Sequence, residues 1–181
     1  MEHCGTKTIE TERLILRRLC ADDANAMFNN WASDPEVTKF LTWPPHESVD
    51  LTKKLLDIWT KEYEKDNFYQ WGIALKPTNE VIGTISVVGW EEPIEAAKLG
   101  YCIGKDWWHQ GITSEALAAV IKYLFQEVKC NRIEARHDIR NPHSGGVMKK
   151  CGMQYEGTLR SADINRLGIC DVAQYAILKS D

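Results

Sequence analysis

The spacing of apolar and polar positions along the chain predicts a mixed α/β protein. Alternation over 12–18 predicts a strand, and apolar runs at 69–75 and 81–88, with a turn at 77–79 between them, predict a hairpin. Three-to-four spacing predicts amphipathic helices that pack on a central twisted sheet, with helices on both faces. Helices are expected at 21–31, 48–65, 113–128 and 142–150, a helical turn at 34–36, and further strands at 97–104, 132–137, 153–159 and 170–179.

The length and composition are those of one compact domain, residues 1–181. A chain of 181 residues can bury about 70% of its unfolded surface, and we find neither a repeat nor a linker. The net charge of −4 and the absence of a basic stripe argue against a nucleic-acid partner. We therefore expect a globular protein that does not bind nucleic acid.

The cysteine and histidine positions favour neither disulfides nor a metal site. Six cysteines are scattered without a CxxC pair, and the five histidines form no HxxxH, so no metal is expected. The first residues lack the apolar core of a signal peptide, and no stretch approaches 18 apolar residues. The chain is expected to be cytoplasmic, with reduced cysteines and no membrane partner.

The segment 99–116 carries the clearest chemistry, because a strand passes through a glycine-containing loop directly into an amphipathic helix. The first amide groups of a helix lack internal acceptors and carry partial positive charge, which suits a pyrophosphate. Gly111 lets the backbone approach such a ligand closely. The alternative is an ordinary turn in which Thr113 or Ser114 caps the helix. The loop lacks the lysine and glycines of Walker and Rossmann motifs.

The same loop resembles a known cofactor-binding motif. Residues 108–113, Trp-His-Gln-Gly-Ile-Thr, are similar to the coenzyme A pyrophosphate loop of the GNAT superfamily of N-acetyltransferases, whose pattern is Arg/Gln-x-x-Gly-x-Gly/Ala. The form with Trp first and Ser-Glu-Ala afterwards resembles the branch that contains ribosomal-protein N-terminal acetyltransferases. Residues 12–17, 141–144, 150–153, 156–160, Gly168 and Asp171 also match that branch, so the resemblance covers about residues 8–178.

The resemblance implies a fold and a cosubstrate. It implies a mixed sheet of about seven strands, splayed at its centre to admit acetyl-CoA, with no metal. The cofactor-binding residues that it implies are Tyr101, Cys102, Ile103, Trp108, His109, Gln110, Gly111, Ile112, Thr113, Ser114, Asn141, Ser144 and Lys150.

The resemblance also implies direct attack of an amine on the thioester, without an acyl-enzyme. The backbone N–H of Cys102 or Ile103 is expected to bind the thioester oxygen. Ser144 occupies the position of the serine that protonates the departing thiolate, three residues after Asn141. The alternative is that Asn141 and Ser144 cap the following helix. Gly145 and Gly146 are expected to weaken that helix.

Several residues are candidates for the general base and for acceptor contact. The carboxylates of Glu91, Glu92 and Glu95 lie between the hairpin and the cofactor strand, although a charged loop of this kind is commonly a solvated surface. His137 and Asp138 follow the next strand and could instead be structural. Trp43, followed by two prolines, is the candidate for acceptor contact. The expected catalytic set is Ser144, Glu95 and Cys102.

The function that we expect is transfer of the acetyl group of acetyl-CoA to a primary amine. The acceptor could be a protein N-terminus, a polyamine or a small-molecule amine, and the enzyme could be a monomer or a homodimer. Lys98 stands where many relatives carry an acidic residue, and Met148 stands where many carry a tyrosine. These two departures leave a second function open, a module that binds acyl-CoA as a sensor or partner with impaired turnover.

Overall fold

The computed structural model describes residues 1–181 and contains one open sheet of eight strands in the order β1-β2-β3-β4-β5-β6-β8-β7. Neighbouring strands are antiparallel except β5 and β6, which are parallel. The additional strand relative to the expected seven is β1, whose two residues are too few to produce an alternation. The strands are β1 (Ile9–Glu10), β2 (Leu14–Arg17), β3 (Gln70–Leu75), β4 (Val81–Glu91), β5 (Ala96–Ile103), β6 (Arg132–Asp138), β7 (Gln154–Asn165) and β8 (Gly168–Leu178).

The helices occur where the apolar spacing predicts them, with small shifts at their ends. The predicted helix at 21–31 is a succession of a 3₁₀ turn, α1 and a π turn that ends at Ala32. The predicted helix at 113–128 begins one residue earlier and ends in a π turn over Leu124–Val128. The helices are α1 (Ala24–Met27), α2 (Pro35–Thr38), α3 (Val49–Glu62), α4 (Ile112–Tyr123) and α5 (Pro142–Lys150).

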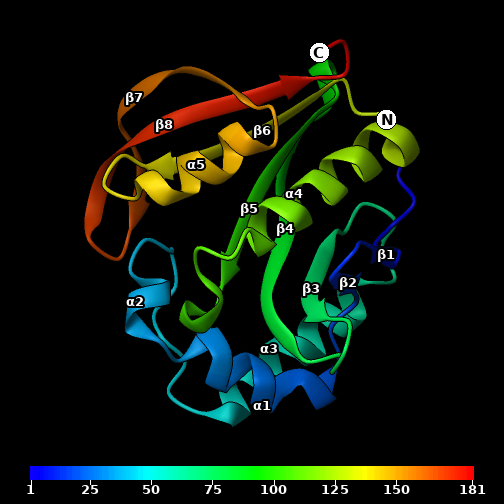
Figure 1. Cartoon of the computed structure of the whole chain (residues 1–181), viewed down its shortest axis with the longest axis vertical. Coiled ribbons are helices and arrows are strands. Elements are labelled where there is room, and N and C mark those ends of the chain that lie inside the picture. The colour runs from blue at the N-terminus through cyan, green and yellow to red at the C-terminus, as the bar shows by residue number, and fades with distance from the viewer.

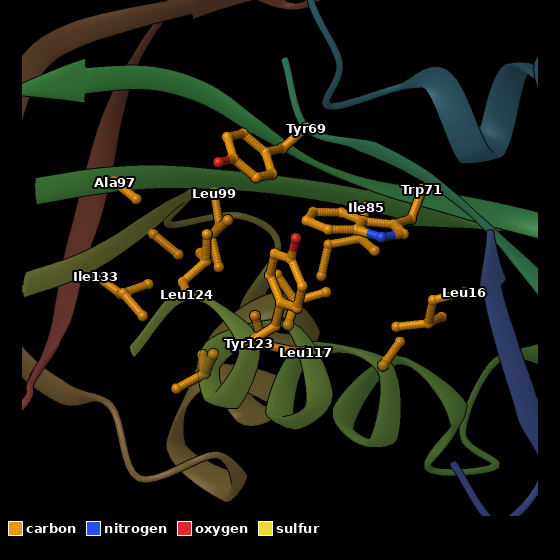
Figure 2. Close-up of a cluster of buried hydrophobic side chains, with 14 of the residues drawn as sticks. Leu16, Tyr69, Trp71, Ile85, Ala97, Leu99, Leu117, Tyr123, Leu124 and Ile133 are labelled. Atoms are coloured by element: carbon orange, nitrogen blue, oxygen red, sulfur yellow. The ribbon is translucent and has the colours of Figure 1, made fainter. Parts of the chain in front are cut away.

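The sheet has a core on each face. Consecutive residues of a strand point to opposite faces, so Ile73 joins a cluster of 25 buried residues whereas Ala74 joins a second cluster of 9. The larger cluster lies between the sheet and α4, where Trp71 and Tyr123 meet edge to face with ring centroids 5.5 Å apart (Figure 2). The smaller cluster contains residues of α1 and α3, including Met27 and Leu56. Helices therefore cover both faces, as the sequence predicts.

The two parallel strands at the centre of the sheet separate after a short pairing. β5 pairs with β6 only from Ala96–Arg132 to Leu99–Ala135, whereas β4 stays paired with β5 as far as Ile103. Beyond Leu99, the half that contains β6, β7, β8 and α5 diverges from the half that contains β1 to β5 (Figure 1). This separation exposes one backbone edge of β5.

No helix of the chain is long and apolar enough to span a bilayer. All six cysteines are free thiols. No group of three or more His, Cys, Asp or Glu side chains has an arrangement that could hold a metal ion.

Candidate active site

A cavity of about 530 Å³ lies between the diverging halves of the sheet. It is lined by the free end of β5, the loop before α4, the first turn of α4, the end of β6 and α5. Of the thirteen residues that the resemblance implies for cofactor binding, Gln110 alone is not part of the lining. Residues 40 positions apart along the chain thus meet in one cleft.

The N-terminus of α4 opens into this cleft with its amide groups free. The residue at the N-cap is Gly111, with a φ of 75°, and no side chain caps the helix. The first amide hydrogen bond of the helix is donated by Glu115 to the Gly111 carbonyl, so the amides of Ile112, Thr113 and Ser114 have no protein acceptor. The alternative in which Thr113 or Ser114 caps the helix is therefore wrong. Free amides and the helix dipole together suit an anionic phosphate group.

An ion pair holds this loop against the start of the sheet. The Glu115 carboxylate accepts from the Arg13 guanidinium at 2.7 Å and from the Thr11 hydroxyl at 2.6 Å. The same guanidinium donates to the Gln110 carbonyl at 3.0 Å, while the Gln110 side chain turns back to donate to Asp106. Gln110 is thus occupied in shaping the loop, which is why its side chain lies outside the cleft.

The free edge of β5 offers one backbone donor to the cleft. The amide of Gly104 donates to Ile82 of β4, and amides alternate in direction along a strand, so Cys102 also faces β4. The Ile103 amide then faces the cleft, and the Ile103 carbonyl on the same side accepts from the Trp108 indole at 3.0 Å. Burial raises the pKa of the Cys102 thiol to about 12, which keeps that thiol protonated. Of the two expected donors, the geometry favours Ile103.

The N-terminal turn of α5 brings a hydroxyl to the cleft. The Asn141 side-chain amide donates to the Ser144 hydroxyl at 3.1 Å, and neither side chain caps a backbone amide of the helix. The Tyr101 phenol crosses from β5 and donates to the Ser144 carbonyl at 3.0 Å. Ser144 is therefore held from two sides, and its hydroxyl proton is not used in a capping bond.

His137 and Asp138 lie at the end of β6 and line the cleft. The Nδ1 of His137 is 2.8 Å from the Asp138 carbonyl, which can only accept, so Nδ1 carries the proton and Nε2 of the neutral ring is the acceptor. The one hydrogen bond of the His137 ring is made by Nδ1, and Nε2 lies next to Gly145 of α5. Hydrogen bonds from Arg140 hold the pKa of the Asp138 carboxyl well below its usual range, which makes Asp138 a poor base.

The three glutamates proposed from the sequence as bases lie elsewhere. Glu95 immediately precedes β5, and its carboxylate binds the N-terminal amino group at 3.1 Å. It lies seven residues before Cys102, which corresponds to roughly 23 Å along a strand. Glu91 pairs with Lys98 at 2.8 Å, and Glu92 approaches His3 at 3.5 Å. None of the three lines the cleft. Glu95 therefore lies away from the cleft, and its place in the expected catalytic set is corrected.

The sequence analysis did not propose several residues of the cleft, among them a histidine. His143, in the first turn of α5, packs edge to face with His109 of the loop, with ring centroids 4.8 Å apart. His109 has a φ of 61°, a left-handed conformation that is strained for a residue with a side chain. The pair joins the two sides of the cleft. His143 lies within residues 141–144, the run that matched the family's pattern, so the sequence already contained the signal.

Comparison with known proteins identifies the same family throughout the chain. Residues 13–154 match the Acetyltransferase (GNAT) domain. An uncharacterized N-acetyltransferase, p20, of Bacillus licheniformis is 31% identical over 175 residues, which cover 97% of this chain and 98% of that protein. The [ribosomal protein uS5]-alanine N-acetyltransferase of Escherichia coli is 25% identical over 155 residues, 82% of this chain and 79% of that protein. A GNAT-family acetyltransferase from Bacillus anthracis superimposes with a TM-score of 0.85 at 26% identity, covering 97% and 100% of the two chains.

Proposed function

The chain belongs to the GNAT family of acetyltransferases, and from this premise we propose that it transfers the acetyl group of acetyl-CoA to a primary amine. The observation that carries the proposal is the separation of β5 from β6 beyond Leu99, next to the free amides at the N-terminus of α4. A thioester donor needs both features, an anion site for the pyrophosphate and a strand edge for the acyl carbonyl. Acetyl-CoA supplies the activated acetyl group.

The residues of the cleft fit this donor. The amides of Ile112, Thr113 and Ser114 would bind the pyrophosphate, with Lys150 at the rim as a further cation. The Ile103 amide would bind the thioester oxygen, because it faces the cleft from the edge of β5. A fixed amide at this point stabilises the negative charge that develops during attack.

Two side chains would move the protons of the reaction. The amine nitrogen forms a bond to the carbonyl carbon, the carbon–sulfur bond breaks, and the electron pair leaves with sulfur. We assign acceptance of the amine proton to Nε2 of His137 and protonation of the thiolate to the hydroxyl of Ser144. This assignment replaces Glu95, and it uses neither Lys98 nor Met148.

The kind of amine decides how much the base must do. An α-amine with a pKa near 8 is roughly one-tenth neutral at pH 7, whereas about one lysine side chain in 2,500 is neutral. Deprotonation therefore costs about 1.4 kcal/mol for the α-amine and about 4.6 kcal/mol for the lysine. One imidazole is adequate for the first case.

The test combines binding with turnover. Acetyl-CoA at 100 times its dissociation constant should stabilise the fold by about 2.7 kcal/mol in a thermal-shift measurement, and calorimetry should detect the same binding. Release of free coenzyme A thiol, measured with a panel of amines, should then require an amine. Binding without amine-dependent release would instead support the acyl-CoA-binding module, and no binding at millimolar acetyl-CoA would contradict both.

A further inference from the structure

A second, larger cavity adjoins the cofactor cleft. Its volume is about 880 Å³, within the roughly 300–1,000 Å³ of small-molecule sites, and it lies beneath the segment 40–46 and α3. The two cavities share residues 99–102 of β5 and residues 136–138 of β6. A molecule in the second cavity would therefore reach His137 and the edge of β5.

The wall of this cavity is apolar and aromatic. Phe40 and Trp43 of the segment 40–46 and Trp59 of α3 line it. Four large apolar side chains at its rim are exposed to solvent. A single exposed apolar side chain is common on protein surfaces, whereas a group of them around one cavity marks a binding site. They are Leu51 (46% exposed), Ile58 (57%), Val88 (68%) and Ile164 (60%).

Both carboxylates of the lining are already paired with arginines. Its two carboxylates are Asp138, bound by Arg140 at 2.6 Å, and Asp163, bound by Arg136 at 3.0 Å. Lys54 adds a positive charge at the rim. No carboxylate of the cavity is left to pair with a second cation on the acceptor, and an ammonium group without a partner is costly to remove from water.

We propose that the acceptor is a primary amine with a bulky apolar body, aromatic or branched, and no cationic group besides the reacting amine. The inference rests on the proposed function and excludes one of its acceptors, the polyamines. The apolar body lies between the segment 40–46 and the rim residues, and the amine lies at His137. An arylalkylamine and the N-terminus of a peptide that begins with phenylalanine share this chemistry.

The experiment compares acceptors in the thiol-release assay. We expect kcat/KM to be at least 10-fold higher for phenethylamine or for a tripeptide that begins with phenylalanine than for propylamine or spermidine. The ratio of kcat/KM for phenethylamine to that for the tripeptide shows whether a small amine or a peptide N-terminus is the better acceptor. Equal or faster acetylation of spermidine would overturn the inference while leaving acetyl transfer intact. Release with none of these amines, despite acetyl-CoA binding, would instead contradict the proposed function.

A pair of matched variants tests the cavity itself. The double variant Val88→Ser/Ile164→Ser removes two apolar side chains from the rim, and we expect a roughly 10-fold higher KM for phenethylamine with little change in kcat. The control Ile94→Ser/Ile169→Ser changes two exposed apolar residues that do not line the cavity. It should leave KM within about twofold. Equal effects of the two double variants would contradict the assignment of the cavity.

Discussion

Gly145 of α5 lies directly against the imidazole of His137 at the end of β6. A Cβ built at Gly145 would be 2.5 Å from Nε2 of His137, closer than two such atoms can approach. A Cβ built at the neighbouring Gly146 would have no other atom within 4 Å. The sequence predicted that both glycines weaken the helix, yet α5 continues through them to Lys150. The first glycine therefore makes room for His137, whereas the second has no such constraint.

This difference predicts opposite effects of two alanine substitutions. Gly146→Ala should stabilise the protein by about 0.5–1 kcal/mol, because alanine loses less backbone freedom in a helix. Gly145→Ala should lose that gain, since its methyl group must displace the ring of His137, and kcat should fall by about 10-fold or more. Melting temperature and kcat measured on both variants decide the matter. Similar kcat values for the two would show that the position of His137 is unimportant for turnover.

Replacement of Ser144 separates a chemical role from a structural one. Ser144→Ala should lower kcat by about 10- to 100-fold, because water can partly replace the hydroxyl as the acid, and should leave the KM for acetyl-CoA nearly unchanged. Stability should change by less than about 1.5 kcal/mol, since the side chain makes one hydrogen bond, with Asn141. Full kcat in a destabilised variant would remove Ser144 from the mechanism.

The loop before α4 yields a prediction about cofactor affinity. Gly111→Asp should weaken coenzyme A binding by about 10-fold or more, because it forces a φ of 75° on a residue with a side chain and brings negative charge to the amides. Gln110→Ala is the matched control, since this side chain faces Asp106 rather than the cleft. Calorimetry with coenzyme A measures both. Equally small losses would mean that the loop is an ordinary turn.

The buried carboxylate of Asp138 should affect stability in acid. Hydrogen bonds from Arg140 lower its pKa in the folded protein, so its contribution is present above the ordinary aspartate pKa of about 3.9 and is lost as the pH falls below that value. Asp138→Asn should lower the melting temperature at pH 6, and the difference from the unchanged protein should shrink towards pH 3. Asp57→Asn, an exposed change on α3, is the control. A difference that is constant across this range would contradict the assignment.

The local elements and one side of the cleft could be predicted from the sequence. Helix spacing, strand alternation and the run from Trp108 to Thr113 are properties of neighbouring residues, so they indicate α4 and its N-terminal loop before any packing is known. Asn141 and Ser144 were proposed in the same way, from a short run of residues, and both line the cleft. The sequence analysis placed Glu95 at the thioester, whereas it lies at the far end of β5. Its distance from the cleft depends on which end of β5 meets the cleft, and the alternation of apolar and polar residues does not contain that information.

The order of elements, their apolar faces and the glycine-containing loop before α4 follow from the sequence, because each depends on residue types at short spacing. The tertiary structure alone decided where β5 leaves β6, which strand amide faces the cleft, and that Gly145 admits His137. It also decided that apolar side chains from α3, β4 and β7 meet around one cavity. These features depend on contacts between residues far apart in the chain, and such contacts form only when the two halves of the sheet pack together.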